Sequence, residues 1–364
     1  MNQFFLWLAA LALTAVLIRI LSPLARRIGL VDEPGGRKVH EGAVPLIGGI
    51  SLFVTFFLLI LLVDTPLYGW RSLFFAAALV FIIGMLDDFK ETPASARFVA
   101  QMGAVLIIVF WGGLKLEYLG DLLGSHPIHF SHMVVPFTLL GGVGVMNAVN
   151  MLDGLDGLAG GVLLVFFTAL WWLAHTAGLS ADATVLGVIC ASLMGFLWFN
   201  MRILGRSRAS VFMGDAGSLF LGLLATWFLI RMTQPPLEVM RPITAVWLLG
   251  LPIMDTVAIM IRRIRQGRSP FSPDREHFHH ILLVAGFSVR TTVFIILTLH
   301  SCLVLLGLTG EWLKLPEYIM FYSFLLLFFL YFWGMNHAWK VMKMLRKVHD
   351  AGVQPETQRT NVNV

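Results

Sequence analysis

Long apolar segments alternate with short polar segments along almost the whole chain. Eleven apolar segments can be distinguished, and each approaches the roughly 20 residues that a helix needs to cross a lipid bilayer. They cover residues 2–22, 46–63, 72–86, 98–113, 133–150, 159–177, 183–200, 216–232, 243–261, 291–309 and 317–336. The segment at 72–86 is short for a crossing, so we expect its helix to extend into the loop that follows. The pattern predicts an all-α, polytopic integral membrane protein with about 11 transmembrane helices.

The composition supports a membrane protein and excludes several other classes. Hydrophobic residues make up 58% of the chain and charged residues only 13%, whereas a soluble domain has about 25% charged residues. These proportions exclude a cytosolic enzyme, a disordered protein and a nucleic-acid-binding domain. The two cysteines, Cys190 and Cys302, lie inside apolar runs, which argues against a disulfide framework and against a cysteine zinc site.

The distribution of basic residues predicts the orientation of the chain in the membrane. Of the 26 Lys and Arg residues, 20 fall in one alternating set of loops, 5 fall in the other set, and Arg19 lies in the first apolar segment. The loops rich in Lys and Arg face the cytoplasm, so we expect the N-terminus outside and the C-terminus inside. In the first segment the positive charges follow the apolar run, unlike in a signal peptide. We therefore expect one transmembrane catalytic domain over residues 1–347 and a flexible cytoplasmic tail over residues 348–364.

The acidic residues are distributed unevenly between the two sides. Those on the predicted outer side are scattered singly, whereas those on the cytoplasmic side cluster at predicted helix ends. Asp87 and Asp88 are adjacent at the end of the third segment, where they repel each other and oppose the helix dipole. A metal ion, a basic side chain or a raised pKa would offset this repulsion. The alternative is a helix end that Lys90 and Arg97 screen.

Four polar residues recur at every third position near the end of the fifth segment. They are Asn147, Asn150, Asp153 and Asp156. On a helix this spacing gives one slowly drifting polar stripe, which favours a binding site for a polar ligand over a small-residue packing surface. Further along, Asp215 lies in the glycine-rich sequence Phe212–Ser218. It either caps the helix that follows or binds a hard cation together with the polar stripe.

The last large cytoplasmic loop combines arginines with a histidine cluster. It contains Arg262, Arg263, Arg265 and Arg268, and then His277, His279 and His280. Without cysteines a structural zinc site is disfavoured, and a loop that contacts phosphate or sugar is favoured. Asp255, within the ninth segment, either pairs with a basic group near Arg262 or supports the site, and we assign it no catalytic role.

Taken in order, these motifs resemble the polyprenyl-phosphate N-acetylhexosamine-1-phosphate transferases, and the resemblance covers nearly the whole chain. It begins at Arg37-Lys-Val-His-Glu-Gly42 and continues through Asp87-Asp88, the Asn147–Leu158 stretch, Phe212-Met-Gly-Asp215 and His277-x-His279-His280. One departure concerns the acidic motif. It often reads Asp-Asp-x-x-Asp in the branch that this chain resembles, but here its last carboxylate is Glu91, which is one methylene longer.

The resemblance implies a reaction and a location. The implied reaction transfers GlcNAc-1-phosphate from UDP-GlcNAc to undecaprenyl phosphate and releases UMP, as the first lipid-linked step of enterobacterial common antigen and lipopolysaccharide O-antigen synthesis. The implied location is the bacterial inner membrane, in a multi-pass protein with no nucleic-acid partner. Another UDP-N-acetylhexosamine is the alternative substrate, and a polytopic transporter is the alternative from a different class. Monomer and homodimer both remain open.

The resemblance also implies roles for individual residues. Asp215 and Asn150 would bind Mg²⁺, with Mn²⁺ as a substitute. The catalytic acids would be Asp87, Asp88, Asp153 and Asp156, and we favour Asp87 as the group that deprotonates or orients the lipid phosphate. Substrate would be held by Asn147, Asn150, Arg265, His277, His279 and His280.

Overall fold

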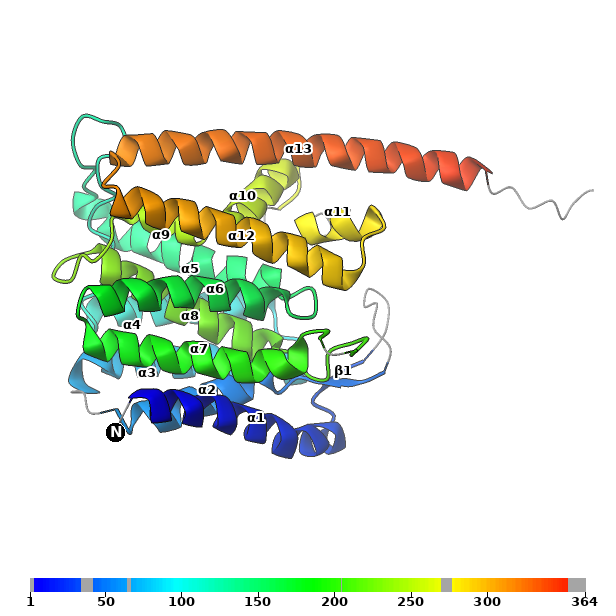
Figure 1. Cartoon of the computed structure of the whole chain (residues 1–364), viewed down its shortest axis with the longest axis horizontal. Helices are drawn as coiled ribbons and strands as arrows, with labels where there is room; N and C mark the ends of the chain where they lie inside the picture. Colours follow the sequence, from blue (N-terminus) through cyan, green and yellow to red (C-terminus); the bar gives the residue numbers. More distant parts are fainter. Residues whose placement is uncertain (1–2, 34–41, 64–66, 204, 270–276, 353–364) are drawn as a thin grey trace, which may run out of the picture.

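The protein is a bundle of long helices, most of which run side by side (Figure 1). The computed structural model describes residues 3–33, 42–63, 67–203, 205–269 and 277–352, with side chains described up to residue 338 except at residues 67 and 68. The elements before residue 160 are α1 (Gln3–Ile28), β1 (Val31–Asp32), β2 (Val44–Pro45), α2 (Gly48–Ile60), η1 (Leu67–Trp70), α3 (Arg71–Phe89), α4 (Ala94–Phe110), η2 (Ser131–Met133), α5 (Val134–Leu152) and α6 (Leu158–Thr176). The remaining elements are α7 (Ser180–Asn200), α8 (Gly214–Thr233), α9 (Pro242–Leu248), α10 (Gly250–Arg265), α11 (Phe278–Val284), α12 (Val289–Trp312) and α13 (Glu317–Gly352). The two short strands form an antiparallel pair.

The helices confirm the prediction of an all-α membrane protein. Within the described residues, eight helices are long and apolar enough to cross a membrane, and a bent pair would make a ninth crossing. Two shorter apolar helices, α2 and α4, coincide with the predicted segments 46–63 and 98–113. Each of the eleven apolar segments thus contains a helix. As expected, the short segment 72–86 extends at its end, because α3 continues to Phe89.

The predicted segment 243–261 is not one continuous helix. It consists of α9 and α10, whose axes differ by 81° on either side of Leu249. Gly250 begins the second helix, and Pro252 has no N–H to donate to the carbonyl oxygen of Leu248, so the helical ladder is interrupted here. Hydropathy alone does not register such a break, because both halves are apolar.

Helix α8 occupies the centre of the bundle and packs against α2, α3 and α5. In its most apolar stretch, 94% of the residues are buried. Its N-terminal turn touches its neighbours backbone to backbone: a Cβ on Gly49 would lie 2.3 Å from the amide nitrogen of Gly217, and one on Gly84 would lie 2.6 Å from the Cα of Ala216. Glycine is needed for such a close approach. These contacts fix the N-terminus of α8 beside the C-terminal end of α3.

Helices α1 and α13 lie at opposite edges of the bundle (Figure 1). In their most apolar stretches only 22% and 17% of the residues are buried, and large side chains such as Phe5 and Phe329 are more than half exposed. Both helices thus present apolar surface suited to lipid. Helix α13 continues to Gly352, so it includes the first residues of the predicted tail. The rest of that tail, most of the Arg37–Gly42 motif and residues 270–276 lie outside the described residues.

Candidate active site

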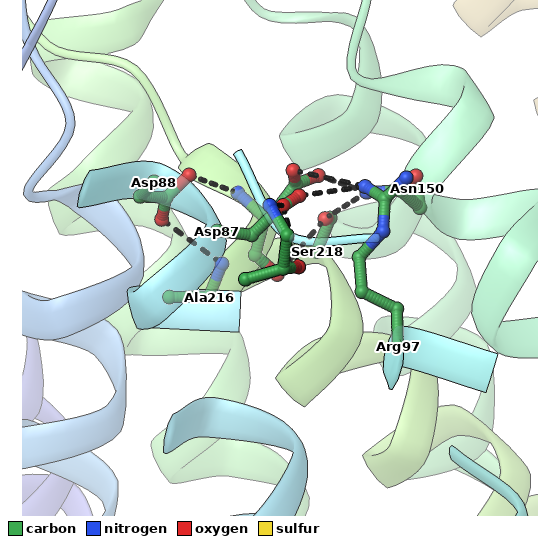
Figure 2. Close-up of polar contacts among 8 residues, drawn as sticks. Asp87, Asp88, Arg97, Asn150, Ala216 and Ser218 are labelled. Carbon is green, nitrogen blue, oxygen red and sulfur yellow. Dashed lines mark hydrogen bonds and ion pairs between the residues drawn. The ribbon is translucent and has the colours of Figure 1, made fainter. Parts of the chain in front are cut away.

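Three helices bring the predicted acidic residues together at the end of the bundle opposite the N-terminus (Figures 1 and 2). Asp88, at the end of α3, accepts hydrogen bonds from the backbone N–H groups of Asp215 at 2.7 Å and Ala216 at 3.1 Å. A carboxylate at this place satisfies free N–H groups and complements the helix dipole. The structure therefore assigns the capping of α8 to Asp88 of the neighbouring helix, which leaves Asp215 free for another role.

Asp87 is held by donors from the segment that follows α3. Its Oδ1 accepts hydrogen bonds from the backbone N–H and the hydroxyl of Thr92 at 2.6 and 2.7 Å, and its Oδ2 lies 2.6 Å from a guanidinium nitrogen of Arg97. The same nitrogen of Arg97 lies 3.4 Å from Asp215. Arg97 thus provides the positive charge that the adjacent carboxylates require.

The polar stripe on α5 contributes one residue to this cluster and one residue to the helix packing behind it. The amide of Asn150 donates hydrogen bonds to Oδ1 of Asp215 and to the hydroxyl of Ser218, as Figure 2 shows. The amide of Asn147 instead donates to Gln101 at 2.7 Å and to the carbonyl oxygen of Val143 at 2.8 Å. Asn150 therefore belongs to the site, whereas Asn147 connects α5 to α4.

Asp153 and Asp156 follow α5 but have different surroundings. Asp156 accepts hydrogen bonds from Arg202 at 2.7 Å and from the backbone of Ala209 at 2.9 Å, and so anchors the segment after α7. The carboxylate of Asp153 has no hydrogen-bond partner within the part of the chain that the structure describes. Burial, together with the charges of Asp215 and Asp156, raises the pKa of the Asp153 carboxyl to about 7. Of the two, Asp153 is the carboxylate available to a ligand.

The histidine cluster packs on the same end of the bundle, around α11. Nδ1 of His277 lies 2.8 Å from Oδ2 of Asp255, and Oδ1 of that carboxylate accepts hydrogen bonds from the backbone of Phe278 and the hydroxyl of Tyr331. Of the two roles expected for Asp255, the structure supports the second: it holds the histidine segment.

His279 is buried against the turn that carries Asp153. It is 3% exposed, and its Nε2 has no hydrogen-bond partner in the described part of the chain. A Cβ on Gly154 would lie only 2.9 Å from that nitrogen. Burial, with the neighbouring His280 and His277, lowers the pKa of His279 to about 3. Arg265, also predicted to bind substrate, stacks on the ring of Phe332 in α13 at 5.1 Å.

The oxygen donors of the site suit a hard divalent cation. Among the described residues, no group of three or more His, Cys, Asp and Glu side chains is already arranged as a metal cage. Mg²⁺, however, typically takes one or two protein carboxylates and completes its shell with water and substrate phosphates. Asp215 and Asp153 supply carboxylates, and the Oδ1 of Asn150 remains beside them because its Nδ2 makes the hydrogen bonds. The donor set therefore fits the expected ion.

The structure adds residues that sequence reasoning did not place in the site. Thr92 and Ser218 carry no distinctive signal in the sequence. Arg97 was expected only as a screening charge, although its position one turn into α4 brings it to both Asp87 and Asp215. Tyr331 lies in an apolar helix far along the chain, and nothing in its local sequence relates it to Asp255.

Comparison with known proteins identifies the family of this chain. Residues 70–233 match the model of glycosyl transferase family 4, a stretch that contains α3, α5 and α8 and therefore the whole carboxylate cluster. Relatives named undecaprenyl-phosphate alpha-N-acetylglucosaminyl 1-phosphate transferase occur in Escherichia coli K12, Yersinia pestis and Haemophilus influenzae. The Escherichia coli relative is 38% identical over 89% of this chain and 88% of its own length. The Yersinia pestis relative is 37% identical over 89% of this chain and 88% of its own length. The Haemophilus influenzae relative is 35% identical over 90% of this chain and 93% of its own length. The chain therefore belongs to the polyprenyl-phosphate N-acetylhexosamine-1-phosphate transferases of glycosyl transferase family 4.

Proposed function

We propose that this protein transfers GlcNAc-1-phosphate from UDP-GlcNAc to undecaprenyl phosphate and releases UMP. One observation carries the proposal: Asp87, Asp88, Asn150 and Asp215 meet from three helices at one end of a membrane bundle. The names of the relatives supply the donor sugar and the lipid acceptor.

The chemistry is transfer of a phosphosugar from a nucleotide diphosphate to a lipid monophosphate. An oxygen of the lipid phosphate attacks the β-phosphorus of UDP-GlcNAc, the bond to the α-phosphate oxygen breaks, and UMP leaves. One diphosphate bond is broken and one is formed, so the reaction needs neither ATP nor a redox cofactor. Positioning and charge neutralisation dominate such catalysis. A cluster of acids with a single nearby arginine suits this task only when a cation accompanies the anionic substrates.

In this proposal, two side chains at the end of α3 and the start of α4 bind and deprotonate the lipid phosphate. Arg97 attracts the phosphate, and Asp87 accepts its proton. Thr92 and Arg97 fix the orientation of the Asp87 carboxylate. Asp88 acts indirectly, because its hydrogen bonds to α8 hold Asp215 in place.

We propose that Asp215, Asp153 and Asn150 would hold Mg²⁺, or Mn²⁺ in its place. The ion would neutralise the diphosphate charge and so reduce the repulsion that an anionic nucleophile meets. Asp153 suits this role because no donor in the described part of the chain occupies its carboxylate. Asp156 would act indirectly, by fixing the segment that precedes α8.

The histidine cluster would hold the sugar and the diphosphate. A pKa of about 3 keeps His279 neutral at pH 7, so it serves as a hydrogen-bond partner rather than as a cation. Its unpaired Nε2 suits a sugar hydroxyl or amide. His277 and His280 would complete this side of the site.

The proposal also includes the topology of the protein. All eleven apolar segments would cross or enter the inner membrane, with the N-terminus outside and the site on the cytoplasmic side. A polyprenyl chain would then remain in the bilayer, and UDP-GlcNAc would arrive from the water. The product would start the synthesis of lipid-linked glycans of the common-antigen and O-antigen kind.

The test is UMP release by the purified protein with undecaprenyl phosphate, Mg²⁺ and a panel of UDP-sugars, each with an EDTA control. We expect release that depends on lipid and metal and occurs with UDP-GlcNAc alone. Release from a different UDP-sugar would replace the proposed donor. Absence of release from every sugar, with folded protein, would refute the proposed reaction.

A further inference from the structure

Asp255 is a buried carboxylate that forms hydrogen bonds with three groups from two segments of the chain, the start of α11 and helix α13. It lies in α10, beyond the 81° bend, and is 6% exposed. Its partners are the ring of His277 at 2.8 Å, the backbone N–H of Phe278 at 3.1 Å and the hydroxyl of Tyr331 in α13 at 2.7 Å. Because a buried charge is costly unless it is fully hydrogen-bonded, this carboxylate strongly favours one placement of the segment that begins at His277.

The ring of His277 restricts the orientation of the His279 ring, because the two rings are in contact. The two rings are stacked, with centroids 5.6 Å apart and planes within 9° of each other. The ring of His280 packs against His279 at 4.2 Å. Since His277 is fixed at its Nδ1 by Asp255, the stack places His279 as well.

The final contact in this series faces the polar turn after α5. His279 is buried, and its unpartnered Nε2 lies at the position where only a glycine, Gly154, leaves space for it. Gly154 follows directly after Asp153, the carboxylate that no described donor occupies. A buried and unsatisfied nitrogen is unfavourable in the free protein, which suits an atom that receives its partner from a ligand.

We propose that Asp255 and Tyr331 are positioning residues for donor-substrate binding, which act by holding His277 and His279 against the Asp153 turn. Neither residue touches substrate. Tyr331 fixes the Asp255 carboxylate, the carboxylate fixes His277, and the stacked rings direct Nε2 of His279 to the nucleotide sugar. This inference rests on the proposed function, because the ligand it assigns to His279 is the donor of that reaction.

Tyr331→Phe tests the proposal because it removes only a hydroxyl group. Tyr322→Phe is the matched control, since Tyr322 lies on the same helix with its side chain exposed. We expect Tyr331→Phe to raise KM for UDP-GlcNAc by about tenfold, the size of effect expected for one lost hydrogen bond to a charged group. KM for undecaprenyl phosphate should stay within twofold of the wild type. A residue that only stabilised the fold would lower the active fraction, and hence kcat, and leave both KM values unchanged.

A double-mutant cycle with His279→Ala separates action through the histidine from an independent effect. If Tyr331 acts through His279, Tyr331→Phe should change KM by less than about twofold in the His279→Ala background, because coupled residues are not additive. Asp255→Asn is a second variant, which keeps an acceptor oxygen but removes the charge, and it should raise KM in the same direction. Multiplicative effects in the cycle, or equal KM values for Tyr331→Phe and Tyr322→Phe, would overturn the proposal.

Chemical modification distinguishes failure of this proposal from failure of the proposed reaction. Diethyl pyrocarbonate labels accessible imidazoles, and His277 and His279 are only 8% and 3% exposed. Tyr331→Phe should increase the labelling rate of both histidines relative to Tyr322→Phe, as measured by mass spectrometry without substrate. Faster labelling without UMP release by the wild type would retain the positioning and refute the reaction. Unchanged labelling of the histidines, together with normal UMP release by the wild type, would refute the positioning and retain the reaction.

Discussion

Two groups of acidic residues, at opposite ends of the helix bundle, have different surroundings. At the end that holds the N-terminus, Asp182 forms a two-point ion pair with Arg231, and Glu311 pairs with Arg241. At the other end, Asp87, Asp88 and Asp153 gather around Asp215 at the start of α8, and Arg97 contacts Asp87 and Asp215.

Under the proposed function, this difference separates acids that stabilise the structure from acids that bind the cation and the substrates. A buried carboxylate with its own arginine is compensated within the chain, and Arg231 also packs over the ring of Trp70. Several carboxylates beside one arginine leave negative charge uncompensated, which is expensive near a membrane. Protonation, or cations or donors from outside, can offset the charge of the second arrangement.

The largest effect on turnover is expected at Asp215, in the centre of the acidic cluster. Asp215→Asn should lower kcat by about 10³-fold, since metal-assisted charge neutralisation is worth several kcal/mol, while the protein stays folded. UMP release at a series of Mg²⁺ concentrations measures the loss. Normal turnover by this variant would show that Asp215 does not act with the metal.

A change in the Asp182–Arg231 ion pair should lower the stability of the protein rather than its turnover. Asp182→Asn leaves Arg231 without its carboxylate and should destabilise the protein by on the order of 3 kcal/mol. Thermal unfolding in detergent measures this effect, with kcat normalised to the folded fraction. If kcat per folded molecule of Asp182→Asn fell as far as that of Asp215→Asn, the two groups of acidic residues would not differ in function.

A smaller effect is expected where the histidine cluster meets the polar turn. Gly154→Ala would place a Cβ 2.9 Å from Nε2 of His279, so the ring must move. We expect kcat/KM for UDP-GlcNAc to fall by about tenfold, equivalent to about 1.4 kcal/mol. Gly144→Ala is the control, because a Cβ there meets nothing within 4 Å. Equal kcat/KM values for the two variants would show that the contact between Gly154 and His279 does not contribute to the site.

The smallest effect concerns stability as a function of pH. The pKa of Asp153 is about 7 in the folded protein and 3.8 as its ordinary value. The folded state therefore binds this proton more tightly, and the stability it contributes is complete below pH 3.8 and lost as the pH rises through 7. Without metal or nucleotide, Asp153→Asn should raise the melting temperature at pH 8, by roughly 1 °C for each kcal/mol regained, and should raise it less at pH 5, where only part of the stability has been lost. An equal shift at both pH values would contradict the assignment.

Much of the fold could be predicted from hydropathy, because a bilayer requires long uninterrupted apolar helices. The break between α9 and α10 could not be predicted in this way, because both halves are apolar and the break depends on the N–H that Pro252 lacks. The meeting of Asp87, Asp88 and Asp215 was predicted only as a shared face. Their contacts depend on the close approach of α8 to α2 and α3, which is a tertiary property.

Individual polar residues were harder to separate by role. Asn147 and Asn150 are one turn apart and look equivalent in the sequence, yet only Asn150 reaches Asp215. Asp153 and Asp156 likewise share a spacing, but Arg202 satisfies Asp156. Such differences depend on partners from distant segments, and a local pattern does not contain them.

The central position of α8 has a consequence for the synthesis of the protein. Its neighbours α2, α3 and α5 precede it in the chain, so they leave the ribosome before the helix around which they pack. Glycine contacts such as Gly84 with Ala216 leave no room for another side chain in its place. Until α8 is made, these earlier helices therefore lack the helix against which they pack. Because α8 also carries Asp215, the bundle closes and the acidic cluster is completed in the same step of assembly.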